Sequence, residues 1–122
     1  MATSNEYLPV ISKLLARTKE RKIDWKGTFE STTFICALEG QYSFEIEKGK
    51  TARTSTPYRS LTMKDSGQAE VFVANAFIPS NESAIENDNL FALLDELYEQ
   101  ARRIALDIDK KVNEVTNILD KI

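Results

Sequence analysis

Histidine is absent from this sequence of 122 residues. Without imidazole, the chain cannot by itself assemble a Ser-His-Asp or Cys-His relay, a histidine-ligated metal site or an imidazole acid-base pair. Only four glycines are present, and the sequence contains no phosphate-cradling glycine loop of the Walker or dinucleotide type. We therefore expect a binding protein that has no catalytic residues, no metal site and no cofactor.

A single cysteine, Cys36, leaves no pair for a disulfide or for thiol exchange. It falls on the apolar face of an expected strand, and no base is present to generate its thiolate. We therefore interpret Cys36 as a buried structural thiol and not as a nucleophile. Glu45 and Glu47 are the nearest candidates for paired carboxylates, but the strand pattern places both on a solvated face.

Long hydrophobic runs are also missing. No apolar run approaches the roughly 20 residues that cross a bilayer, and the start, MATSNEYLPV, lacks the basic and apolar stretches of a secretion signal. Sixteen Lys and Arg against nineteen Asp and Glu give a net charge of −3, which supplies no chain-wide field to hold a duplex nucleic acid or an anionic membrane. We therefore expect a cytoplasmic protein that binds neither duplex nucleic acid nor a membrane.

The apolar content that is present, 42% of the sequence, is enough for one core, so we expect a single domain over residues 1–122. From Ser4 to about Glu20, apolar residues recur at steps of three and four, which predicts an amphipathic helix. Thr3 and Glu6 match a capping box at its start. The stretch LLARTKERKIDWK, which begins in this helix and runs past it, is the most basic in the chain.

After Gly27 the apolar period changes to two, which predicts strands. Two strands over 34–38 and 42–46 are joined at the turn signal EGQ, and the polar segment 47–56 is typical of a mobile connection. A third strand contains residues 61–63, and a fourth runs over 69–78. Both faces of this fourth strand are largely apolar, so we expect it to be covered on both sides and to lie at the sheet centre.

After an Asn-rich loop, the spacing of three and four continues from Leu90 to Ile122 and predicts one long helix, or two helices separated near 107–109. An uninterrupted helix of about 32 residues would be about 48 Å long, more than the sheet of a small domain can cover. We therefore predict that its C-terminal part packs on a second copy. The alternative is a break at Asp107, with the last helix folded back onto its own sheet.

This order of elements makes the fold class α+β: an N-terminal helix, an antiparallel β-meander of about four to five strands, and a long C-terminal helix or helix pair. Arg102 and Arg103 are adjacent in the last helix, and guanidinium groups suit phosphate contacts. Adjacent helical positions are about 100° apart, so only one of them should face a given pocket. Side-chain amides of the Asn-rich loop can hydrogen-bond to the edge of a nucleotide base, and the Phe77 ring can stack on the face of such a base.

Each of these candidates has a structural alternative. The arginine pair can be a solvated surface feature, and Phe77 can be a core residue. Trp25, inside the basic stretch, can form a stacking platform, but we favour a ring that plugs the sheet edge while its cationic neighbours stay in solvent. Arg53 and Arg59 lie in or beside the polar connection and are further phosphate ligands in principle.

The order of a short amphipathic helix, KIDWKG, the hairpin TFICALEGQYSFEIEKG, the strand VFVANAF, an Asn-rich loop and LFALLDELYEQARRIALD resembles the phage-encoded Thoeris anti-defence proteins of the first-described type. The resemblance covers most of the chain. It implies a non-enzymatic sponge, dimeric or larger, in the host cell cytoplasm. Such proteins sequester the glycocyclic ADP-ribose made by a defence TIR enzyme, and some also bind cyclic trinucleotides at separate positions.

By this resemblance the ligand lies at Phe77, Asn87, Arg102 and Arg103, between protomers. A cyclic ADP-ribose has an adenine, ribose hydroxyls and a pyrophosphate, which call for an aromatic face, an amide and arginines respectively. A different class of function is a protein-binding immunity or antitoxin-like module that uses the acidic C-terminal helix. From Ser80 onward the chain has ten carboxylates against five Lys and Arg, which suits a basic partner.

Overall fold

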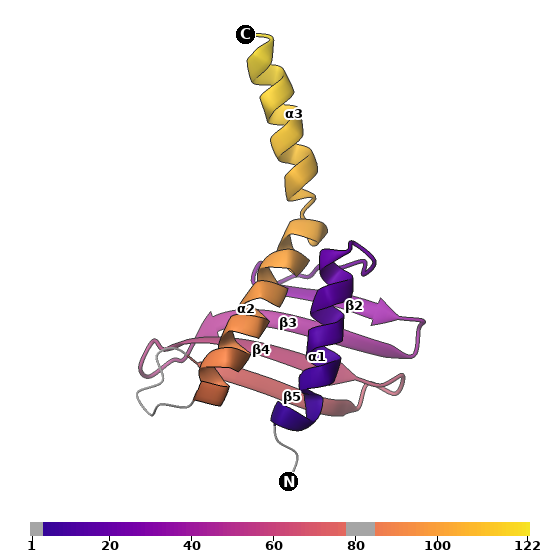
Figure 1. Ribbon diagram of the computed structural model, residues 1–122, viewed down its shortest axis with the longest axis vertical. Helices are drawn as coiled ribbons and strands as arrows, with labels where there is room; N and C mark the ends of the chain where they lie inside the picture. Colours follow the sequence, from indigo (N-terminus) through magenta and orange to yellow (C-terminus); the bar gives the residue numbers. More distant parts are fainter. Residues whose placement is uncertain (1–3, 78–84) are drawn as a thin grey trace.

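The computed structural model describes residues 4–77 and 85–122, which form a sheet layer and a helix layer (Figure 1). The elements are α1 (Ser4–Lys19), β1 (Lys26–Gly27), β2 (Thr33–Leu38), β3 (Tyr42–Lys50), β4 (Pro57–Lys64), β5 (Glu70–Phe77), α2 (Ile85–Ala105) and α3 (Ile108–Asp120). The strands form one antiparallel sheet in chain order, β1 to β5. The predicted α+β class is confirmed.

The connection after α1 is held by a buried side-chain relay. The Thr18 hydroxyl donates to the Leu14 carbonyl at 2.7 Å, and the Trp25 indole N–H donates to the Thr18 hydroxyl at 3.0 Å. Trp25 is only 1% exposed, so the ring fills space beneath the end of α1 and is not available for stacking. The interpretation that we favoured for Trp25 is confirmed. The predicted capping box of α1 includes Thr3, which lies outside the described residues.

Local turn chemistry sets the hairpins. Glu39 and Gly40 have left-handed φ values of 53° and 70°, which reverse the chain between β2 and β3. The Asp65 carboxylate accepts hydrogen bonds from the backbone N–H groups of Gly67 and Ala69 at the β4–β5 turn. The mobile connection predicted from Glu47 is wrong at its start, because β3 continues to Lys50. The polar residues there occupy exposed or half-buried positions of a strand.

The position predicted for the fourth strand is also wrong. β5 lies at the edge of the sheet, and only its even-numbered residues Phe72, Ala74 and Ala76 are buried. Val71 and Val73, on the other face, are 44% and 43% exposed. None of the described helices covers that face, so an apolar residue on both sides of a strand does not here indicate two covering layers.

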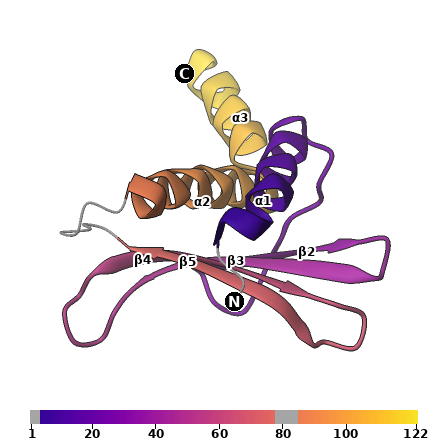
Figure 2. The same ribbon diagram turned by 60° about the horizontal axis from the view of Figure 1, so that its bottom comes forward.

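The core lies between the sheet and the helices α1 and α2, which cover the same face (Figure 2). Leu94 and Leu97 of α2 and Ile46 and Leu61 of the central strands are all 0% exposed. The face of the sheet that points away from α1 and α2 is called the open sheet face below. Within residues 4–77 and 85–122, no helix has the length and apolar character needed to span a membrane.

Of the two arrangements left open for the C-terminal segment, the structure shows two helices separated near Asp107, and an uninterrupted helix is wrong. Asp107 adopts a left-handed conformation with φ 52° and ψ 42° between α2 and α3, which Asp tolerates better than most residues. The alternative in which the last helix folds back onto its own sheet is wrong. α3 contains no buried residue and projects away from the two layers (Figure 1).

We predict that Leu94→Ala lowers the free energy of unfolding by about 2–5 kcal/mol, because it leaves a cavity between α2 and the sheet. Urea denaturation followed by circular dichroism measures the change. Leu106→Ala is the matched control, since Leu106 is 39% exposed and should cost less than about 1 kcal/mol. Equal costs for the two variants would contradict the assigned core.

Candidate functional site

Arg59 is a largely buried cation that contacts helix α2 from the sheet. The register pairs Arg59 with Ala76 and Lys48, so its side chain lies on the helix-covered face of the sheet, where it is 17% exposed. Its Nε donates to an Asp95 carboxylate oxygen at 2.8 Å, and a second guanidinium nitrogen donates to the Tyr58 carbonyl at 2.9 Å. These contacts fix the guanidinium plane in one orientation.

Two aromatic rings and two further cations surround this guanidinium. Its central carbon lies 4.9 Å from the centroid of the Phe91 ring and 5.8 Å from that of Tyr98. The Lys48 ammonium lies 5.3 Å from the Tyr98 centroid, and Arg102 follows Tyr98 by one helical turn. These five residues, Lys48, Arg59, Phe91, Tyr98 and Arg102, are called the Tyr98 cluster below.

The electrostatics of the Tyr98 cluster favour an anion. Burial raises the pKa of the Tyr98 phenol, while the charges of Arg102 and Arg59 act in the opposite direction. Asp95 neutralises Arg59, and Glu99 pairs with Arg102 at 3.1 Å. Three cations against these two carboxylates leave one net positive charge, and the Lys48 ammonium makes no ion pair with a described carboxylate. The cluster thus combines aromatic faces with positively charged donors.

The structure separates the two arginines that were predicted as ligands. Arg102 lies close enough to Tyr98 for its charge to act on the Tyr98 phenol, and its side chain is 36% exposed. Arg103 instead approaches the Asp109 carboxylate at 3.8 Å, at the start of α3, where Arg21 also binds Asp109 at 3.1 Å. Arg102 is therefore the one of the pair that belongs to the candidate site, and Arg103 supports the junction between α2 and α3.

Phe77 and Asn87 lie away from Arg102 within one chain. Phe77 belongs to the open sheet face, is 40% exposed and packs against Tyr58 with ring centroids 6.1 Å apart, so its alternative role as a core residue is wrong. Asn87 is in the first turn of α2, and its side chain lies outside the described residues. Fifteen residues separate Asn87 from Arg102, about 22 Å along the helix. A single protomer does not bring the four predicted ligands together.

Sequence reasoning missed three members of the Tyr98 cluster. Lys48, Phe91 and Tyr98 were assigned no role, and Arg59 was placed in or beside a mobile connection. For Lys48 the missing signal is strand register, because Lys48 and Arg59 are directly opposite in the β3–β4 ladder. Register depends on non-local pairing and is not visible in the periodicity of one strand.

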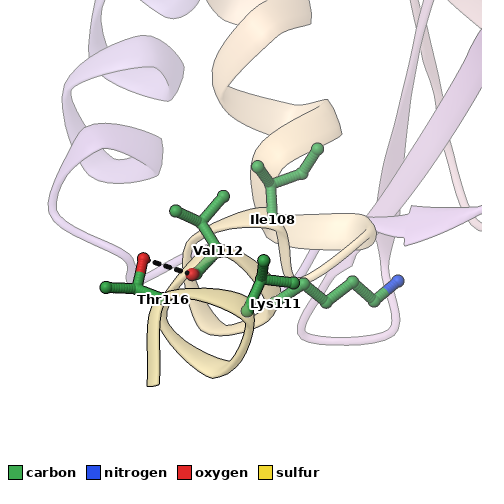
Figure 3. Close-up of a pocket in the computed structure, with 5 residues that line it drawn as sticks. Ile108, Lys111, Val112 and Thr116 are labelled. Carbon is green, nitrogen blue, oxygen red and sulfur yellow. Dashed lines mark hydrogen bonds between the residues drawn. The ribbon is translucent and has the colours of Figure 1, made fainter. Parts of the chain in front are cut away.

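Residues 4–77 and 85–122 also line surface hollows that lie outside this cluster. One of about 300 Å³ flanks α1 and has Lys13 and Arg17 among its apolar lining residues. Another, of about 140 Å³, lies on the open sheet face beside Ile35 and Glu45. A further hollow, of about 310 Å³, is formed by α3 and is lined by Ile108, Lys111, Val112, Val115 and Thr116 (Figure 3).

The remaining chemical candidates are structural. Cys36 is 3% exposed, which confirms the expected buried thiol, and burial raises the pKa of that thiol to about 12. Glu45 and Glu47 lie on the open sheet face as predicted, although both are half-buried. Across the described ranges, no group of three or more Cys, Asp or Glu side chains is arranged to hold a metal ion.

Comparisons with known proteins add no relative. No protein-family model, curated protein or solved structure matches the chain.

We predict that Cys36 in the native protein does not react with Ellman's reagent at pH 8, because its thiol is buried and stays protonated far above that pH. Absorbance at 412 nm should rise by one thiol equivalent only after denaturant is added. Rapid labelling of the folded protein would show that the β2–β3 region opens readily and would contradict the assigned burial.

Proposed function

We propose that this protein binds a nucleotide signal of the cyclic ADP-ribose type and sequesters it without cleavage, which keeps an antiphage defence effector inactive in the host cytoplasm. The observation that carries the proposal is the Tyr98 cluster, where three cations meet two aromatic rings on a rigid layer. The absence of histidine from the whole sequence removes the commonest acid-base catalyst and favours capture over turnover.

Each part of such a ligand has a counterpart. A pyrophosphate matches the guanidinium of Arg102 and the ammonium of Lys48, which are the accessible donors of the cluster. Arg59 is already oriented and neutralised by Asp95, so it contributes oriented N–H donors, and not net charge, without losing further side-chain entropy on binding. An adenine can stack on an exposed ring, which is the role we retain for Phe77 of a neighbouring protomer.

Sequestration requires tight binding, which supports self-association. Nanomolar affinity corresponds to about 12 kcal/mol, more than an open surface supplies to a small ligand. A second copy can close the site and bring a Phe77 or an Asn87 to it that its own chain cannot supply. The exposed apolar residues of α3 favour such an assembly, so we propose a dimer or larger oligomer.

Binding of a basic protein through the acidic C-terminal helix has less support. Asp95 binds Arg59, and Glu96 binds Lys19 at 2.9 Å. Asp109 binds Arg21 and lies 3.8 Å from Arg103. These carboxylates already have internal cationic partners, so a basic protein would have to displace them.

We predict that ADP-ribose or a cyclic ADP-ribose isomer binds the purified protein and that Arg102→Ala and Lys48→Ala each weaken the affinity roughly tenfold or more. A charged hydrogen bond contributes about 1.5–3 kcal/mol, which sets that magnitude. Isothermal titration calorimetry measures the dissociation constants, and a thermal-shift screen selects the isomer beforehand.

Lys22→Ala is the matched control, because Lys22 is an exposed cation that lies outside the Tyr98 cluster. Arg103→Ala should retain most of the affinity, since its side chain is directed at Asp109. The ligand should be recovered chemically unchanged after the complex is heated. Turnover of the nucleotide, or equal binding by Arg102→Ala and the parent protein, would exclude the proposal.

The proposed self-association predicts the oligomeric state of the protein. The parent protein should sediment as a dimer or larger species at micromolar concentration, and Val115→Asp should convert it to the 13.8 kDa monomer. Because α3 has no buried residue within its own chain, the variant should keep its helical circular-dichroism signal. A parent protein that sediments as a monomer would exclude self-association.

A further inference from the structure

The described chain leaves two amphipathic surfaces uncovered, and one of them is the stripe along α3. Its apolar members, here called the α3 stripe, recur at steps of four and three: Ile108, Val112, Val115, Leu119 and Ile122. Val112, Val115 and Leu119 are 57%, 53% and 63% exposed. Figure 3 shows Ile108, Val112 and Thr116 along this helix, with Lys111 beside them. Exposed apolar residues in such a regular pattern indicate a contact with another surface.

The second uncovered surface is the open sheet face. It carries Ile35, Val71 and Val73, which are 40–44% exposed, while the Tyr58–Phe77 ring pair lies apart from them at the C-terminal end of β5. Figure 2 shows the described helices lying only on the opposite side of the sheet. An antiparallel sheet can leave one face in water, but such a face is normally polar. This one carries apolar side chains beside acidic ones.

Polar groups in the middle of that face have no protein partner. Ser60 and Thr33 are 7% and 8% exposed, and neither hydroxyl makes a hydrogen bond within the described residues. Both lie in register with Glu47 between them. Burial and repulsion from Glu45 and Glu30 raise the pKa of Glu47, and the structure pairs no described cation with it. No buried side-chain oxygen or nitrogen among the described residues lacks a hydrogen-bond partner, so these hydroxyls are within reach of solvent. The half-buried Glu47 carboxylate, to which no described cation is paired, is suited to a cation that comes from outside the chain.

The dimensions of the two surfaces agree. α3 has 13 residues and is therefore about 20 Å long. Five strands at about 4.8 Å spacing measure about 19 Å between the outer strand axes. A helix laid across the open sheet face would therefore span its width without overhang.

Charge is complementary as well. Lys111 lines the same hollow as Val112 and Val115, so its ammonium flanks the α3 stripe. It forms no ion pair with the described residues. Packing of the stripe on the open sheet face would bring Lys111 within reach of Glu45 and Glu47, two carboxylates of that face to which no described cation is paired.

We infer that the self-association proposed above is a reciprocal exchange, in which α3 of each copy packs on the open sheet face of the other. α3 continues from α2, on the helix side of its own sheet, so it cannot reach its own open face (Figures 1 and 2). A second copy turned over by a twofold axis presents that face to it. The axis generates the contact twice, and each sheet then lies between two helical layers.

Pairing of the two α3 stripes with each other is the competing arrangement. It would bury only two heptads of a short helix, which form a marginal coiled coil. It would also leave both open sheet faces in water, with Glu47, Ser60 and Thr33 still without partners from the protein. The reciprocal exchange instead covers the α3 stripe and the open sheet face in the same contact.

The test is a cross-linking experiment on mixed variants of the full chain. Val73→Cys places a thiol on the open sheet face, and Val115→Cys places one on the α3 stripe. The two proteins are unfolded together, refolded and treated with a short bismaleimide, which bridges the thiols over a range of helix positions. Cys36 remains in place, because its buried thiol does not react.

We expect a cross-linked dimer in the mixture and almost none in either variant alone. Strong cross-linking of Val115→Cys alone would overturn the exchange in favour of α3 pairing, and cross-linking of Val73→Cys alone would overturn it in favour of stacked sheets. No product in a mixture that still sediments as a dimer would also overturn it. A monomeric parent protein would instead refute self-association, and calorimetry with the nucleotide would then show whether the Tyr98 cluster of one protomer binds the ligand without a second copy.

Reversal of the charges at Glu47 and Lys111 provides a second test of the proposed packing. Glu47→Lys should raise the dimer dissociation constant at least tenfold, because it replaces the carboxylate with an ammonium that repels Lys111 of the other copy. Lys111→Glu in the same chain should restore much of the affinity. Failure of the double variant to regain affinity would remove Lys111 from the contact with Glu47 and contradict the proposed packing.

Discussion

The structure depends on burial of one face of the sheet beneath α1 and α2. Leu94 and Leu97 of α2 meet Ile46 and Leu61 of the central strands, and all four side chains are fully removed from solvent. At about 25 cal/mol per Å² of apolar surface, this layer is the main favourable contribution to folding. It also determines which side chains stay accessible, because every strand residue that points away from the helices joins the open sheet face.

The Tyr98 cluster is a consequence of the same layer. Arg59 lies on the buried face of β4, where an uncompensated guanidinium would be costly, and α2 supplies Asp95, Phe91 and Tyr98 to surround it. Arg59 is thereby fixed, while Lys48 makes no ion pair with a described carboxylate and Arg102 is held only by Glu99, its neighbour one helical turn earlier. The candidate site is therefore rigid at its centre and adaptable at its rim, which favours binding without a large entropic cost.

Features set by neighbouring residues were predictable from the sequence, and features set by distant contacts were not. The helix of residues 4–19, the turn at Glu39 and Gly40 and the break near Asp107 follow from periodicity and turn chemistry. The edge position of β5 was missed, because alternation identifies the two faces of a strand but not the layer that covers each. Phe77 was misplaced for that reason. Lys48 was missed because its proximity to Arg59 depends on strand register.

Assembly and ligand binding are thermodynamically connected if a second copy completes the site. A helix of 13 residues with no buried side chain is marginal in water, so the proposed partner surface would stabilise α3. A nucleotide that contacts two protomers would bind the dimer and not the monomer, and would therefore stabilise the dimer by mass action. The α3 stripe and the Tyr98 cluster then act together. One sets the fraction of protein in the binding-competent form, and the other sets the affinity of that form for the anion.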